Sequence, residues 1–184
     1  MRWIVPLIMS AGVAFGSECP LGEDYTEELL QVIEDARAAP DQATGGRAAQ
    51  EMWTILLRAP DEAAQNVLDQ GMRMRESFDF AGAHAAFDSL VEYCPEYAEG
   101  YNQRAFVSFL REDYPAALKD LDLALSLSPH HVGAQSGRAL TLMNLQRIPE
   151  AREQMLQALE NNPWLSERAL VAKGAPLGPV GEDI

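Results

Sequence analysis

A 34-residue repeat constrains this 184-residue chain more than any other feature. Alanine recurs at that spacing at Ala83, Ala117 and Ala151, and two further columns share the period. Those columns are the prolines Pro95, Pro129 and Pro163 and the large apolar residues Phe87, Leu121 and Met155. A period between 20 and 50 residues is typical of solenoids, whose units bury their apolar faces only by stacking.

Each copy of the repeat contains two stretches with helical spacing of apolar residues. Residues 98–131, for example, divide at a turn over residues 112–114 and stop at Pro129. Pro115 and Pro149 fall in the first turn of a helix, where a missing N–H costs nothing. The expected helices are 61–76, 80–93, 97–111, 115–127, 132–144 and 149–161. The predicted fold class is therefore all-α.

The repeat resembles the tetratricopeptide repeat (TPR). Its seven characteristic positions are filled in the second copy by Tyr101, Arg104, Ala105, Ala117, Leu121, Ala124 and Pro129. The resemblance covers three repeats, 64–97, 98–131 and 132–165, within a region that spans 61–165. It departs from the family pattern at position 7 of each copy, where Gln70, Arg104 and Arg138 replace the usual Leu, and at Leu90, where Ala is usual. It implies a right-handed α-solenoid of helix-turn-helix units, and we expect Arg104 to pair with Asp120.

Residues 17–60 contain a further helical pair. Apolar residues have helical spacing over 23–38 and again over 47–58, and residues 44–46 (Thr-Gly-Gly) read as the turn between them. Counted back by 34, Trp53 falls in the column of Phe87. We interpret the pair as a degenerate first repeat or a cap, since terminal units of solenoids need a polar outer face. A pair packed in another register is the alternative.

Residues 1–16 have the pattern of a secretory signal peptide. Arg2 precedes an apolar run of 13 residues, and small residues at Ala14 and Gly16 form a cleavage site. The run is short for a permanent membrane helix. We therefore expect export to the periplasm, with an uncleaved anchor as the alternative.

Cys19 and Cys94 are the two cysteines of the chain. In a stack of alternating helices, the start of a first helix and the end of a second helix lie at the same end. Export would place both residues in an oxidising compartment. We therefore predict a Cys19–Cys94 disulfide, with two unrelated thiols as the alternative.

Residues 166–184 are expected to form a short capping helix and then a tail. The helix would cover the last repeat. From Lys173 onward glycine and proline are frequent, so we expect the tail to be disordered.

The composition favours a binding protein over an enzyme. The net charge of −14 argues against binding nucleic acid through bulk charge. We find no catalytic motif, and we expect neither a cofactor nor a metal site. The three histidines, His84, His130 and His131, are interpreted as solvated surface or turn residues.

The resemblance places a binding groove on the concave face, along the first helix of each repeat. The candidate groove residues are Leu68, Met72, Arg75, Asn102, Phe106, Phe109, Ser136, Leu140 and Met143. This mostly apolar set suits an amphipathic helix or an extended peptide. Apart from Asn102, it does not match the TPR subclass that clamps a C-terminal carboxylate. The alternative is that Phe106, Phe109 and Met143 pack in the core or are covered by the chain ends.

The sequence thus predicts a periplasmic scaffold or adaptor that binds a partner protein or peptide in an apolar concave groove. A self-associating structural spacer, which would use the same face to form a homodimer, is the second hypothesis. The sequence does not name the partner, because a fold alone does not fix function.

Overall fold

The computed structural model describes residues 18–179, and the predicted signal peptide lies outside them. These residues form eight α-helices and one 3₁₀-helix, and no strand. The helices are α1 (Thr26–Ala38), α2 (Gln42–Leu56), α3 (Glu62–Glu76), α4 (Phe80–Tyr93), α5 (Ala98–Leu110), α6 (Tyr114–Leu127), α7 (Val132–Asn144), α8 (Ile148–Asn161) and η1 (Ser166–Val171).

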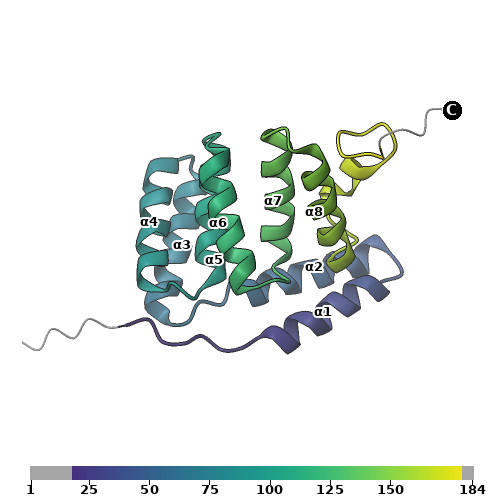
Figure 1. The fold of residues 1–184 in the computed structure, drawn as a ribbon. Helices are drawn as coiled ribbons and strands as arrows, with labels where there is room; N and C mark the ends of the chain where they lie inside the picture. The colour runs from purple at the N-terminus through teal and green to yellow at the C-terminus, as the bar shows by residue number, and fades with distance from the viewer. Residues whose placement is uncertain (1–17, 180–184) are drawn as a thin grey trace, which may run out of the picture.

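Helices α3 to α8 pack as three successive hairpins that stand side by side (Figure 1). The alanines of the 34-residue period allow close approach within each hairpin: Ala83, Ala117 and Ala151 are all fully buried. The large residues of the next column are buried too, and Phe87 packs against α3 of its own hairpin, where a Cβ at Gly71 would lie 2.5 Å from its ring. The predicted all-α solenoid is thus confirmed.

The turn inside each hairpin has the same backbone conformation. Phe78, Glu112 and Gln146 have φ values of 65°, 62° and 60°, and they are spaced by the period of the repeat. The left-handed region normally favours glycine. The turn therefore repeats its backbone conformation in every hairpin, although the residue at this position differs each time.

The N-terminal pair differs from the predicted degenerate repeat. Helices α1 and α2 lie across one end of the upright helices instead of extending their row (Figure 1). Their apolar side packs against Val132 of α7 and against Trp164 and Leu165, which follow α8. The pair therefore folds back over the stack, which corresponds to the alternative of another register.

The predicted turn at residues 44–46 lies inside α2. The chain turns instead at residues 39–41, because Pro40 disfavours helical backbone at Ala39. Asp41 then caps α2, since its carboxylate accepts a hydrogen bond from the Thr44 N–H at 2.8 Å. Position 45 needs a glycine because of close packing and not because of a turn. A Cβ there would lie 2.2 Å from the indole of Trp164.

The C-terminal segment also differs from the prediction as far as Pro179, the last residue described. Leu177 is fully buried and packs with Leu142 and Met155. Its N–H donates to the Leu170 carbonyl at 2.8 Å, and its carbonyl accepts from Arg152 at 2.5 Å. One apolar side chain thus anchors a segment whose glycine and proline content suggested disorder.

Candidate functional site

A groove lies where the first helices of the three hairpins meet α2. Its volume is about 390 Å³. Seven of the nine predicted residues line it: Met72, Arg75, Asn102, Phe106, Phe109, Ser136 and Leu140. The structure thus brings most of the candidate set together, and their role in binding a partner stays a prediction.

Two predicted groove residues lie elsewhere. Leu68 is fully buried, because it packs inside the first hairpin with Phe87 and Leu90. Met143 packs against the core of the last hairpin, in the cluster that contains Leu177. Leu68 and Met143 occupy positions that line the groove in the TPR family, but in this chain they pack against core residues.

Helix α2 supplies one wall of the groove, which sequence reasoning did not anticipate. Its contributions are Gln50, Trp53 and the adjoining Leu57. Trp53 packs against Gly133 in the first turn of α7, where an added Cβ would lie 2.5 Å from the indole ring. The tryptophan on an amphipathic helix and the glycine at the start of α7 were the signals that could have indicated this contact.

The groove is apolar with one cation. The Arg75 guanidinium lies 4.9 Å from the centre of the Phe106 ring, as in a cation–π contact. It also donates to Gln103 Oε1. Burial lowers the pKa of Arg75, and the carboxylates of Glu76 and Glu99 oppose this effect. Among residues 18–179 no carboxylate lies within ion-pair distance of Arg75.

A fully buried carboxyl group organises the polar side of the groove. Glu99 accepts hydrogen bonds from Gln103 at 2.5 Å, from Asn102 at 3.1 Å and from His131 at 2.7 Å. The Nδ1 atom of His131 accepts the Ala134 N–H at 3.1 Å, so its Nε2 carries the proton donated to Glu99. This network fixes the side chain of Gln103, which contacts Arg75.

The histidine interpretation was wrong for His131. Its side chain is fully buried, because it caps α7 and bonds to Glu99 at the same time. His84 pairs with Asp88 at 2.9 Å near the surface. No group of three His, Cys, Asp or Glu residues in the described part of the chain gathers as metal ligands do.

The predicted pair inside the second hairpin is confirmed. Arg104 binds Asp120 through two hydrogen bonds of 2.7 Å each. Arg104 thereby takes the place of the usual Leu with a bidentate contact between α5 and α6. We interpret this pair as structural, since neither residue lines the groove.

The predicted disulfide is present between Cys19 and Cys94. Cys94 is the C-cap that follows α4 and is buried, and Cys19 precedes α1. The bond fixes the segment before α1 to the first hairpin. Within the part of the chain that the structure describes, no helix has the length and apolar character needed to cross a membrane.

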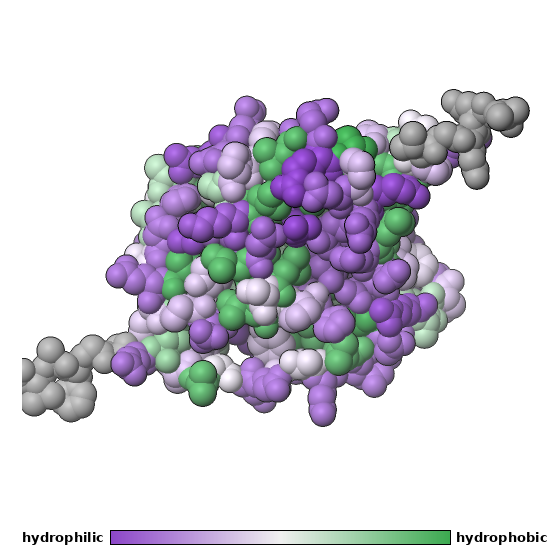
Figure 2. Space-filling model, in the orientation of Figure 1, coloured by the Kyte–Doolittle hydropathy of each residue, from purple (hydrophilic) through white to green (hydrophobic). Residues whose placement is uncertain are grey.

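The surface seen in Figure 2 is mostly hydrophilic, with hydrophobic residues in separate spots. Isolated apolar residues of this kind are normal on protein surfaces. That face therefore gives no reason to place a binding site on it.

Solved structures of TPR domains have a fold similar to that of this chain. The first TPR domain of Spaghetti (RPAP3), bound to the HSP90 peptide SRMEEVD, matches 58% of this chain and 84% of its own at 22% identity, with a TM-score of 0.56. The TPR2B domain of yeast Sti1 in a pHsp70 complex matches 59% of this chain and 90% of its own at 21% identity, with the same TM-score. The fold is therefore a helical solenoid of the TPR kind.

Two proteins with similar sequences are named as tetratricopeptide repeat proteins. A tetratricopeptide repeat protein 36 homolog of Nematostella vectensis is 41% identical over 70 residues, which are 38% of each chain. A TPR repeat-containing protein of Rhizobium etli is 37% identical over 57 residues, 31% of this chain and 28% of its own. The match thus spans about a third of each relative. No family profile matches the chain, and the relatives support the TPR family for its repeats.

Proposed function

We propose that this protein is a periplasmic scaffold or adaptor that binds a partner protein or peptide in its groove. The observation that carries the proposal is Phe106, which is 45% exposed although it lies among apolar groove residues. Aromatic side chains in such positions dominate the energy of many interfaces. An exposed Phe beside Arg75, which has no ion-pair partner among residues 18–179, offers a partner both apolar and polar contacts.

The size of the groove favours a short anchor. A volume of about 390 Å³ is near the lower end of small-molecule sites. Helix α2 already occupies the adjoining part of the concave face through Trp53. We therefore propose that one or two large apolar side chains of the partner enter the groove, with a polar group near Arg75.

Two further observations support the proposal. The two similar structures described above are named as complexes, one with the HSP90 peptide SRMEEVD and one with pHsp70, which supports a peptide as the occupant. The pattern of residues 1–16 supports export, and a disulfide is compatible with an oxidising compartment. The proposed role is binding without catalysis.

The test is a crosslinking capture from an envelope extract. Phe106→Asp places a charge in the groove at a side chain that is already half exposed, so the fold should persist. We expect the variant to lose the partner, with an affinity decrease of at least about 30-fold for a central aromatic residue. Phe78→Asp is the matched control, since Phe78 is 80% exposed and lies outside the groove.

The competing outcome is self-association. Light scattering after size exclusion would then show a dimer that Phe106→Asp converts to a monomer. A monomer at all concentrations would exclude the spacer hypothesis. Capture that Phe106→Asp and Phe78→Asp affect equally would contradict the proposed groove.

A further inference from the structure

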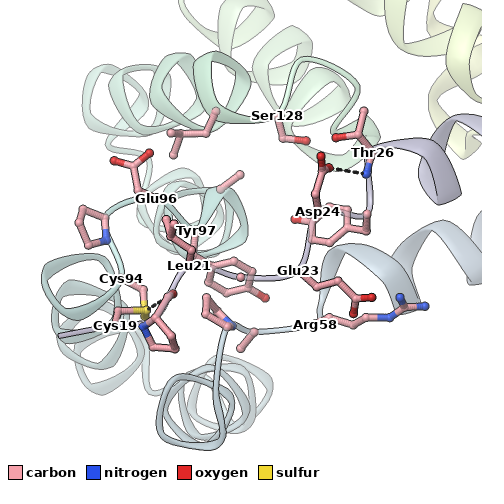
Figure 3. A pocket seen from close by; sticks show the side chains of 18 of the residues that line it. Cys19, Leu21, Glu23, Asp24, Thr26, Arg58, Cys94, Glu96, Tyr97 and Ser128 are labelled. Atoms are coloured by element: carbon pink, nitrogen blue, oxygen red, sulfur yellow. Dashed lines mark hydrogen bonds between the residues drawn. A yellow bond between two sulfur atoms is a disulfide. The ribbon is translucent and has the colours of Figure 1, made fainter. Parts of the chain in front are cut away.

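A second and larger cavity lies on another part of the molecule. Its volume is about 960 Å³, and it shares no lining residue with the groove. One side is the extended segment of residues 18–25, which we name the strap. The opposite sides are residues 58–60 and 92–98 and the turn at 127–130 (Figure 3).

The strap is held at both ends. The disulfide joins Cys19 to Cys94 at one end (Figure 3). At the other end Asp24 accepts the Thr26 N–H at 3.0 Å, and Leu29 of α1 is buried in the core. The strap therefore spans the cavity as a fixed rim.

The main chain of the strap is unpaired between these anchors. From Leu21 to Asp24, no N–H or C=O group hydrogen-bonds to another main-chain group of the described residues. Leu21 is 90% exposed, so this stretch faces solvent. An extended, unpaired main chain is a template for pairing with an extended peptide.

The cavity is rich in carboxylates. Five line it: Glu18, Glu23, Asp24, Glu92 and Glu96. The one arginine of the lining, Arg58, already binds Glu28 through hydrogen bonds of 2.5 and 2.6 Å. The cavity therefore has an excess of negative charge.

Two tyrosines and a histidine add polar groups to the lining of the cavity. Burial, followed by the buried Glu99 carboxylate, raises the pKa of Tyr25 and of Tyr97, which both line the cavity. His130 also lines it, and its Nδ1 is a buried atom without a partner among the described residues. The aromatic rings offer further contacts to a cationic ligand.

We propose that this cavity is a second docking site, for an extended segment of a partner protein that carries lysine or arginine. The segment pairs through its main chain with residues 21–24 of the strap. Its basic side chains contact the carboxylates of the cavity. The overall charge of −14 favours the approach of such a partner.

The probe for the test is a fluorescein-labelled ten-residue peptide of alternating lysine and threonine. Its affinity is measured by fluorescence anisotropy at physiological salt. The double variant Glu92→Gln, Glu96→Gln should bind it about tenfold more weakly, since each exposed ion pair contributes modestly. The control Glu153→Gln, Glu160→Gln has the same charge change on α8 and should bind it within twofold of the parent.

A second peptide tests the main-chain pairing. The same sequence with an N-methyl group at every second residue keeps its charge and loses half of its main-chain donors. It should bind the parent protein about tenfold more weakly. Equal affinity of both peptides, or equal losses in both double variants, would overturn the proposal in favour of non-specific attraction.

The test is independent of the groove. Phe106→Asp should leave the affinity for the lysine peptide unchanged, because Phe106 does not line the cavity. Failure of the peptide to bind any of these proteins would overturn the second site. It would leave the proposed function of the groove as it stands.

Discussion

Two adjacent glycines of α2 should respond to alanine in opposite directions. A Cβ at Gly45 would lie 2.2 Å from the indole of Trp164, whereas a Cβ at Gly46 would meet nothing within 4 Å. In a helix, glycine to alanine stabilises by about 0.5–1 kcal/mol. Gly46→Ala should therefore stabilise the protein by that amount.

Gly45→Ala has the same gain in helix propensity and a steric cost in addition. Trp164 is rigid and held in place, since its Nε1 donates to the Ala36 carbonyl at 2.8 Å. Overpacking of this kind costs about 1–3 kcal/mol. The two variants should thus differ by about 2 kcal/mol, or about 4–8 °C in Tm for a chain of this length.

The assay is urea unfolding of both variants, followed by circular dichroism. A control introduces Gly45→Ala into a Trp164→Ala background, where the steric cost disappears and the alanine should stabilise. Equal stabilisation by Gly45→Ala and Gly46→Ala in the parent background would refute the contact between α2 and the residues after α8. The folding of the N-terminal pair over the stack would then be wrong.

Three further predictions concern stability. In the Cys19→Ser, Cys94→Ser variant the free energy of unfolding should be about 4 kcal/mol lower than in the oxidised parent, as the chain-entropy model gives for a separation of 75 residues. An unchanged urea midpoint would contradict this prediction. His131→Ala should destabilise by about 3 kcal/mol, because it removes one of the three donors to the buried Glu99 carboxyl group and the side-chain cap of α7. His130→Ala should cost much less in the same urea assay. Hydrogen bonds from the Ala64 N–H and then from the Tyr93 hydroxyl lower the pKa of Asp61 in the folded protein. The ionised carboxylate therefore stabilises the fold at pH values above the ordinary pKa of Asp, near 4. This stabilisation is lost as the pH falls through the lowered pKa of the folded protein. The stability difference between the parent and Asp61→Asn should therefore shrink between pH 5 and pH 2, and a difference independent of pH would contradict the cap.

The repeats were predictable because local and global signals agree in them. The ends of α4 and α7 match the expected ranges 80–93 and 132–144. Period, proline positions and buried alanines all point to the same hairpins, and such consistency favours one fold. The pairing of Arg104 with Asp120 followed from the same alignment of the two helices.

The N-terminal pair was not predictable in the same way. Gly45 and Gly46 are typical of a turn in sequence, and the reason for Gly45 is a tryptophan 119 positions further along the chain. Contacts at such separations leave no local signal. The burial of Leu177 is a similar case, since its partners lie in earlier helices.

The candidate groove was predictable in part. First-helix positions gave seven of its lining residues, because the family register places them on one face. The wall from α2 and the network around Glu99 required the three-dimensional structure. Leu68 and Met143 were misplaced because packing inside each hairpin decides which side chains stay accessible.

The most direct test of the account places a photo-crosslinking amino acid, p-benzoyl-L-phenylalanine, at position 106 and, separately, at position 78. Both positions carry an exposed Phe, and only Phe106 lines the groove. The account predicts that irradiation in an envelope extract attaches a defined partner at position 106 and not at position 78. Attachment of the same partner at both positions, or at position 78 alone, would contradict binding in the groove.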